Sequence, residues 1–113
     1  WYTAPGLLKH WFDKVLLRGW AYGEGGTALR GKRCLWVVTT GGGGIAYSEK
    51  GMHKRAFEAY VPVIEQTAVF CGMRWETPLV LHDVHALSDA ALDEAARGYR
   101  ARLESLLERK SAP

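Results

Sequence analysis

The stretch TTGGGGIAYSEKGMH, residues 39–53, holds the side chains best suited to chemistry. Four consecutive glycines follow Thr39 and Thr40, and Tyr47 and His53 come after them, six positions apart. A phenol and an imidazole can each donate a proton to a bound molecule. Glycines let main-chain N–H groups approach a planar ring or a phosphate without a Cβ in the way. The stretch is therefore a candidate ligand loop, with Tyr47 and His53 as its candidate proton donors.

The glycine pattern by itself leaves two interpretations open. A Walker phosphate loop is excluded, because no Gly-Lys-Ser/Thr sequence follows the glycines. A dinucleotide fingerprint can be fitted as Gly41, Gly43 and Ala46, but loose matches are common in a run of glycines. The pattern fits a ligand loop and a flexible turn equally well. The neighbouring Tyr47 and His53 favour the ligand loop, although each alone is more often structural.

The loop directly follows an apolar run, CLWVVTT, over residues 34–40. The run is rich in β-branched residues and shows no alternation, which predicts a strand buried on both faces, as in a parallel sheet. In open α/β sheets ligands bind at the carboxyl ends of the strands. The glycine loop is therefore expected where a ligand binds.

A helix is expected before this strand. In residues 4–19, APGLLKHWFDKVLLRG, apolar residues recur at helical spacing and charged residues take the other face. Thr3 or Ala4 would be the N-cap, Pro5 would lie in the first turn and Gly19 would end the helix.

Two further helices and a second strand follow the loop. A helix is predicted from Pro62 to Cys71, with non-helical geometry at the residue before the proline and with Gly72 as its end. The run RWETPLVLHDV, residues 74–84, predicts a strand that contains a proline. The last helix is predicted to begin at Ser88 as N-cap and to expose a face where arginines pair with Glu104 and Glu108.

The order helix, strand, helix, strand, helix predicts a doubly wound α/β domain with a parallel sheet. No repeat or linker divides residues 1–113, so the chain is one unit. Two central strands alone do not make a stable sheet. The chain is expected to be the C-terminal part of a larger domain, or to complete its sheet by oligomerisation.

Composition argues against several classes of protein. The net charge is +3 and the basic residues are scattered along the chain, which is typical of a solvated surface and predicts no nucleic-acid partner. Cys34 and Cys71 lie in apolar runs without CxxC spacing, which predicts reduced core thiols of an intracellular protein. No apolar run is long enough to span a bilayer. His82 and His85 have no Cys or carboxylate cluster beside them, so no metal site is predicted.

Four blocks of the chain resemble consecutive blocks of one family: WYTAPGLLKHWFDKV, WAYGEGG, TTGGGGIAYSEKGMH and FCGMRWETP. The family is the flavodoxin-like NAD(P)H:quinone oxidoreductases, the DT-diaphorase group, which includes the flavoprotein ancillary subunits of glutathione-gated potassium-efflux systems. The resemblance covers nearly all of the chain in order. The family's first strand and phosphate-binding loop precede the WY motif, so residues 1–113 are expected to be the C-terminal part of a single flavodoxin-like domain that lacks its N-terminal strands.

The resemblance implies roles for particular residues. Tyr47 and His53 match the pair that supports charge and proton movement in the diaphorases, and Tyr47 would also contact the flavin. Trp20 and Tyr22 would wall the nicotinamide and quinone pocket across a dimer interface, with Gly42 and His53 as further substrate contacts. The cofactor, FMN or FAD, would lie against or be held by Trp1, Tyr2, Thr39, Thr40, Gly41 and Gly42.

The implied activity is a two-step exchange in which NAD(P)H gives a hydride to flavin N5 and leaves, and a quinone then takes its place and receives the hydride. Such an enzyme would be a cytoplasmic homodimer, or would lie at the inner face of the membrane. One alternative is a regulatory flavoprotein subunit that docks on a potassium-efflux transporter. Another is a flavin-free interaction module. The efflux subunits vary at the tyrosine position, so Tyr47 favours a reductase.

Overall fold

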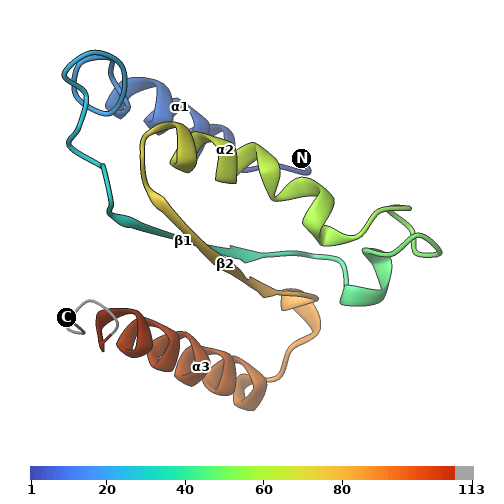
Figure 1. Cartoon of the computed structure of the whole chain (residues 1–113). Helices are drawn as coiled ribbons and strands as arrows, with labels where there is room; N and C mark the ends of the chain where they lie inside the picture. The colour runs from blue at the N-terminus through green and yellow to red at the C-terminus, as the bar shows by residue number, and fades with distance from the viewer. Residues whose placement is uncertain (109–113) are drawn as a thin grey trace.

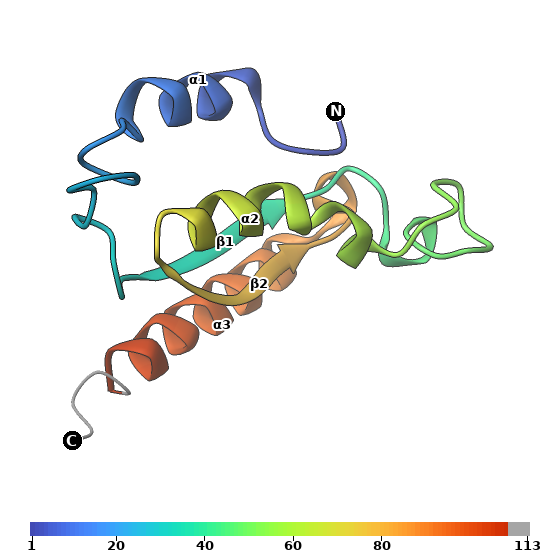
Figure 2. The same ribbon diagram turned by 45° about the horizontal axis from the view of Figure 1, so that its top comes forward.

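The computed structural model describes residues 1–108, which form three layers with a two-stranded parallel sheet in the middle. Helices α1 and α2 lie on one side of the sheet, and helix α3 lies on the other (Figures 1 and 2). This arrangement confirms the predicted α/β order and the parallel strands. The elements are α1 (Gly6–Val15), β1 (Arg33–Thr39), η1 (Gly44–Ala46), η2 (Phe57–Tyr60), α2 (Pro62–Phe70), β2 (Arg74–Leu81), η3 (Val84–Ala86) and α3 (Asp89–Glu108).

The proline inside β2 is accommodated by an irregularity in the pairing. The register shifts between Leu35 and Val37 of β1, where two residues of β2, Thr77 and Pro78, stand against a single residue of β1. A proline has no N–H to donate to the ladder, and a bulge is one of the few places in a sheet that tolerate it. Strand β2 therefore forms as predicted in spite of Pro78.

The prediction that β1 is buried on both faces is wrong for this chain. Trp36 is buried, but the next residue, Val37, is 42% exposed. Within residues 1–108 each strand has a partner along one edge only, and a sheet of this width leaves apolar side chains open to solvent. The buried apolar residues are Ala21, Trp36, Ile64, Ala68, Cys71 and Leu106.

Helix α1 is shorter than predicted at both ends. Pro5 is its N-cap and lies before the first turn rather than in it. The chain leaves the helix at Leu16, which has ψ 70°, so Gly19 does not end the helix. The chain turns back here because Ala21, whose N–H donates to the Leu17 carbonyl, is fully buried.

The other helix ends agree better with the predictions. Ser88 caps α3, because its hydroxyl accepts the N–H of Ala91 at 3.3 Å. Gly72 ends α2 with φ +76°, as glycine readily does. The predicted non-helical geometry at Val61 is wrong, since its φ and ψ are −63° and −42°. The 3-10 turn η2 leads directly into α2 and holds Val61 in helical geometry.

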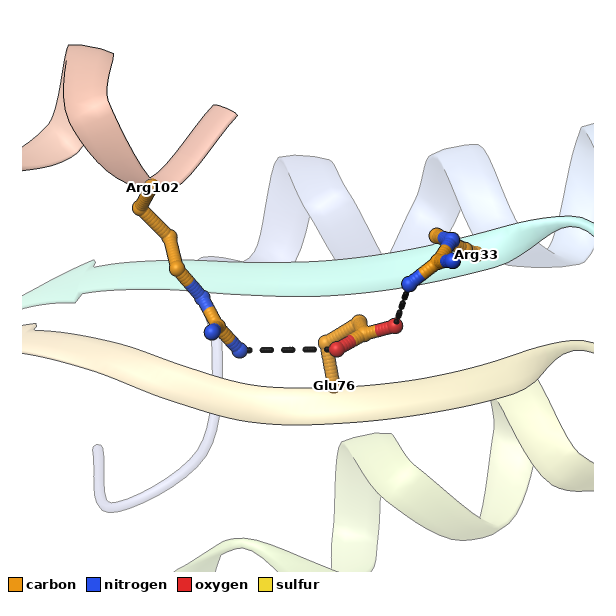
Figure 3. Close-up of polar contacts among 3 residues, drawn as sticks. All are labelled: Arg33, Glu76 and Arg102. Atoms are coloured by element: carbon orange, nitrogen blue, oxygen red, sulfur yellow. Dashed lines mark hydrogen bonds and ion pairs between the residues drawn. The ribbon is translucent and has the colours of Figure 1, made fainter. Parts of the chain in front are cut away.

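An ion-pair network links both strands to α3 (Figure 3). The Glu76 carboxylate accepts hydrogen bonds from Arg33 at 2.8 Å and from Arg102 at 3.4 Å, and the Glu76 side chain is 12% exposed. The predicted exposed pairing on α3 is confirmed for Glu104, which pairs with Arg100 at 3.2 Å. Within residues 1–108 no ion pair to Glu108 forms. Arg102 turns toward the sheet instead, because a part-buried carboxylate needs a cationic partner.

Cys34 is half-buried and Cys71 is buried, and neither forms a disulfide within residues 1–108. Burial raises the pKa of both thiols, because an apolar surrounding disfavours the thiolate. None of the helices in residues 1–108 has the length and apolar character needed to cross a membrane.

Candidate ligand site at the carboxyl end of the sheet

The glycine loop is tied to the end of β2. Thr40 donates its N–H to the Leu81 carbonyl at 2.9 Å, Val84 donates to the Thr40 carbonyl at 3.1 Å, and Asp83 donates to the Gly42 carbonyl at 3.1 Å. The loop lies beyond the carboxyl ends of both strands, at one end of the sheet (Figure 2). These bonds give the start of the loop a defined shape, which favours a ligand loop over a flexible turn.

Two glycines of this segment are closely packed. A Cβ on Gly42 would lie 3.3 Å from His53 Nε2 and 3.5 Å from the Tyr47 ring. A Cβ on Gly51 would overlap the carbonyl oxygen of Ile45. Glycine at these positions lets the chain fold back so that the Tyr47 and His53 side chains pack against the glycine loop.

The structure brings Tyr47 and His53 together. Their ring centroids are 4.4 Å apart, and the main-chain N–H of His53 donates to the Ala46 carbonyl at 3.0 Å. Tyr2 joins them from the start of the chain, because its hydroxyl lies 3.0 Å from His53 Nδ1 and its ring stacks on Tyr60 at 5.4 Å. Three of the predicted site residues therefore meet although Tyr2 and His53 are 51 positions apart.

A pocket of about 340 Å³ opens between the N-terminal segment, β1 and the glycine loop. All the predicted flavin-contact residues line it. Five further aromatic or apolar residues line the pocket and were not predicted from the sequence: Trp36, Val38, Met52, Phe57 and Tyr60. Two of them come from one face of β1, and the other three come from the segment that folds back after the glycine loop. The complete lining is Trp1, Tyr2, Thr3, Trp36, Val38, Thr39, Thr40, Gly41, Gly42, Tyr47, Met52, His53, Phe57 and Tyr60.

Several donors at the pocket are unused. Among residues 1–108, the N–H groups of Gly41 and Gly42 and the hydroxyl of Tyr47 have no hydrogen-bond partner. Adjacent main-chain N–H groups in a loop form a concave site for an anion or an electron-rich edge. The pocket therefore combines flat apolar walls with donors along one border.

Thr40 faces inward. It is 8% exposed, and its hydroxyl lies 2.7 Å from the Gly42 carbonyl oxygen and 2.8 Å from His82 Nδ1. Thr39, by contrast, is exposed, and both threonines line the pocket. His82 was assigned no role from the sequence, because its partner Thr40 is 42 positions away. In residues 1–108 no three His, Cys, Asp or Glu side chains form a group that could hold a metal ion.

Trp20 and Tyr22 lie away from this pocket. The loop between α1 and β1 lies at the end of the sheet opposite the glycine loop (Figure 2). Tyr22 packs on the Phe70 ring at 5.1 Å, and Trp20 is 47% exposed. Within one chain these two residues do not join Gly42 and His53. The predicted role for them requires the pocket of a second copy.

Comparison with solved structures shows three close matches in fold. A thermophilic tryptophan halogenase from Streptomycin violaceusniger is 39% identical with a TM-score of 0.83. The general stress protein 14 from Treponema denticola, in complex with FMN, is 35% identical with a TM-score of 0.83. An NADPH-quinone reductase from P. pentosaceus is 31% identical with a TM-score of 0.79.

These matches cover 88%, 94% and 88% of this chain, and 58%, 60% and 58% of the three other chains. The chain thus spans less than two thirds of the length of each. The profile of the family described as "Flavodoxin-like fold" matches residues 1–103. The predicted fold class is confirmed, and the chain belongs to the flavodoxin-like fold family.

Proposed function

We propose that this protein binds a flavin, FMN or FAD, at the glycine loop and serves as an NAD(P)H:quinone oxidoreductase. One observation carries the proposal: the free N–H groups of Gly41 and Gly42 border an aromatic pocket at the carboxyl end of a parallel strand. This is the place where open α/β sheets bind ligands. The similarity to an FMN complex and to an NADPH-quinone reductase supports the choice of ligand and reaction.

The residues present fit the ring system of a flavin. A volume of about 340 Å³ is at the low end of the range of about 300–1,000 Å³ for small-molecule sites. It suits a flat three-ring group rather than a whole nucleotide. Tyr2, Trp36 and Tyr60 supply aromatic surface, while the free donors of Gly41 and Gly42 suit the polar edge of such a ring.

A bound flavin would supply hydride chemistry, taking a hydride from NAD(P)H and passing it to a quinone. The Gly41 and Gly42 N–H groups and the Tyr47 hydroxyl would stabilise negative charge on the ring. One well-placed donor of this kind is worth about 3 kcal/mol.

His53 would hold or deliver the proton that a quinone oxygen needs. Its Nδ1 is engaged by the Tyr2 hydroxyl at 3.0 Å, while its Nε2 lies beside Gly42 at the pocket. A positioned proton donor typically contributes a factor of about 10² to 10⁴ in rate. The Tyr2 hydroxyl would orient the imidazole.

The first test is whether the 113-residue chain takes up flavin. Added FMN or FAD should bind, with quenched fluorescence and a shifted absorbance band near ~450 nm, where oxidised flavins absorb. A chain that leaves the spectra of both flavins unchanged would overturn the assignment of the pocket.

The second test addresses His53 and Tyr47. The variants His53→Gln and Tyr47→Phe should each reduce quinone-dependent NAD(P)H oxidation, His53→Gln by about 10²-fold or more, with flavin content unchanged. Turnover equal to that of the unaltered protein in both variants would refute their catalytic roles. Lys50→Gln, an exposed residue of the same segment, is the control and should leave turnover unchanged.

A further inference from the structure

His82, the residue after β2, is joined to the glycine loop through Thr40. Its Nδ1 lies 2.8 Å from the Thr40 hydroxyl oxygen. Its ring lies against that of Tyr47, with centroids 5.1 Å apart, and edge-on to Phe57 at 5.6 Å. His82 itself does not line the pocket. It therefore contacts the site only through Thr40, Tyr47 and Phe57, which line the pocket.

The direction of the hydrogen bonds follows from the chemistry of the three groups. The Gly42 carbonyl can only accept, so at 2.7 Å the Thr40 hydroxyl donates its single hydrogen to that oxygen. Thr40 then has only acceptor capacity left toward His82. His82 must donate from Nδ1, and the order is His82 N–H to Thr40 O–H to Gly42 C=O.

These two hydrogen bonds, called the relay below, end on the part of the loop that carries the unpartnered N–H groups of Gly41 and Gly42. The Gly42 carbonyl accepts both the Thr40 hydroxyl and the Asp83 N–H, and the Thr40 carbonyl accepts the Val84 N–H. In a trans peptide the C=O and the following N–H point in opposite directions. The Gly41 N–H therefore points away from Val84, and the Gly42 N–H lies between two peptides whose carbonyls are held.

We propose that His82 is a positioning residue of the ligand site. By donating from Nδ1 to Thr40, it holds the Gly42 carbonyl and so fixes the peptide that follows the Gly42 N–H, while the Val84 N–H fixes the peptide that precedes it. Together these two fixed peptides keep the Gly41 and Gly42 N–H groups directed at the electron-rich edge of a planar ligand. For flavin as that ligand, the inference rests on the proposed function. The orientation of the loop does not depend on the ligand.

A matched pair of variants separates the hydrogen bond from ring packing. His82→Asn keeps an N–H donor near the position of Nδ1 and loses the ring, whereas His82→Phe keeps a ring against Tyr47 and loses the donor. FMN titration should give a dissociation constant close to that of the unaltered protein for His82→Asn. For His82→Phe it should be about tenfold weaker. The opposite ranking would overturn the proposal in favour of ring packing.

Thr40→Val tests whether the two residues act together. If His82 acts through Thr40, His82→Phe should weaken FMN binding much less when Thr40→Val is already present. Fully additive losses would show that His82 acts by another route and would refute the relay.

NMR distinguishes failure of this inference from failure of the proposed function. In ligand-free protein, neutral His82 should carry its proton on Nδ1, and His82→Phe should shift the Gly41 and Gly42 amide signals more than His82→Asn does. A proton on Nε2, or equal shifts in both variants, would overturn the positioning role. If the chain binds no flavin but shows the expected NMR signals, only the proposed function fails.

Discussion

The chain has a glycine-rich loop with aromatic residues at each end of its sheet, and the two loops use glycine differently. In the loop between α1 and β1, Gly19, Gly23, Gly25 and Gly31 have φ values from +74° to +84°, which other residues rarely adopt. Residues 41–44, all of them described, have no positive φ. Backbone conformation thus explains four of the five glycines of the first loop, all but Gly26, and none of residues 41–44.

In the second loop, space is the reason for Gly42, while a Cβ on any of the other three glycines would make only ordinary contacts. Gly42 must accommodate His53 and Tyr47. A Cβ on Gly41 would meet only His85, at 3.7 Å, which is an ordinary contact. The described part of the protein therefore has no need of glycine at position 41. A ligand that approaches the main chain closely would need it.

The polar interactions at the two ends of the sheet also differ. Near the amino ends of the strands, Arg33 and Arg102 hold the part-buried Glu76 (Figure 3), so these three charges pair within the protein. At the carboxyl ends, the bonds through Thr40 leave Gly41 and Gly42 with free donors. We infer that one end maintains the fold and the other is kept available for a ligand.

The largest expected effect is on stability at the amino end. Gly26 is buried, and a Cβ there would overlap the main chain of Tyr22. Gly26→Ala should lower the free energy of unfolding by about 2–4 kcal/mol, because the backbone must shift. Urea denaturation measures the loss. Gly98→Ala, where a Cβ meets nothing within 4 Å, is the control and should stabilise helix α3 by about 0.5–1 kcal/mol. Equal stability of Gly26→Ala and the unaltered protein would contradict the close contact between Gly26 and the Tyr22 main chain.

The second prediction compares one glycine from each loop. Gly41→Ala should leave the melting temperature unchanged and weaken FMN binding about tenfold, a loss equivalent to about 1.4 kcal/mol. Gly19→Ala should cost about 1 kcal/mol of stability, because its φ is +84°, and should leave FMN affinity unchanged. Calorimetry and fluorescence titration of both variants provide the comparison. If Gly41→Ala lost stability but not affinity, the contrast between the two ends would be wrong.

The smallest effect concerns pH. Burial raises the pKa of Cys34 and Cys71 in the folded protein, so at alkaline pH the folded state binds more protons than the unfolded state. This contribution to stability is complete below about pH 8.5, the ordinary thiol value, and is lost as pH rises through the folded-state pKa values. The variant Cys34→Ala/Cys71→Ala should lose less stability than the unaltered protein between about pH 8 and pH 10. Parallel stability curves in urea would show that the thiols do not contribute.

Local pattern was sufficient for the types of the helices and strands and for placing the candidate loop. The cap at Ser88, the start of α2 at Pro62 and its end at Gly72 follow from interactions within a few residues of one another. The β-branched apolar run of β1 indicates a strand even though its partner β2 is distant in the sequence. The glycine loop could be placed at the carboxyl end of a parallel strand for the same reason. Its residues Tyr47 and His53 are close in sequence, and only short-range folding is needed to bring them near each other.

Tertiary structure decided what depends on distant partners. The sequence alone did not show that His82 would meet Thr40, or that Arg102 would turn inward to Glu76, since these pairs are 42 and 26 positions apart. Exposure of β1 was mispredicted for a related reason, because burial depends on how many strands and helices cover a face. Hydrogen-bond partners and burial are properties of the packed layers, whereas helix, strand and turn preferences are properties of short segments.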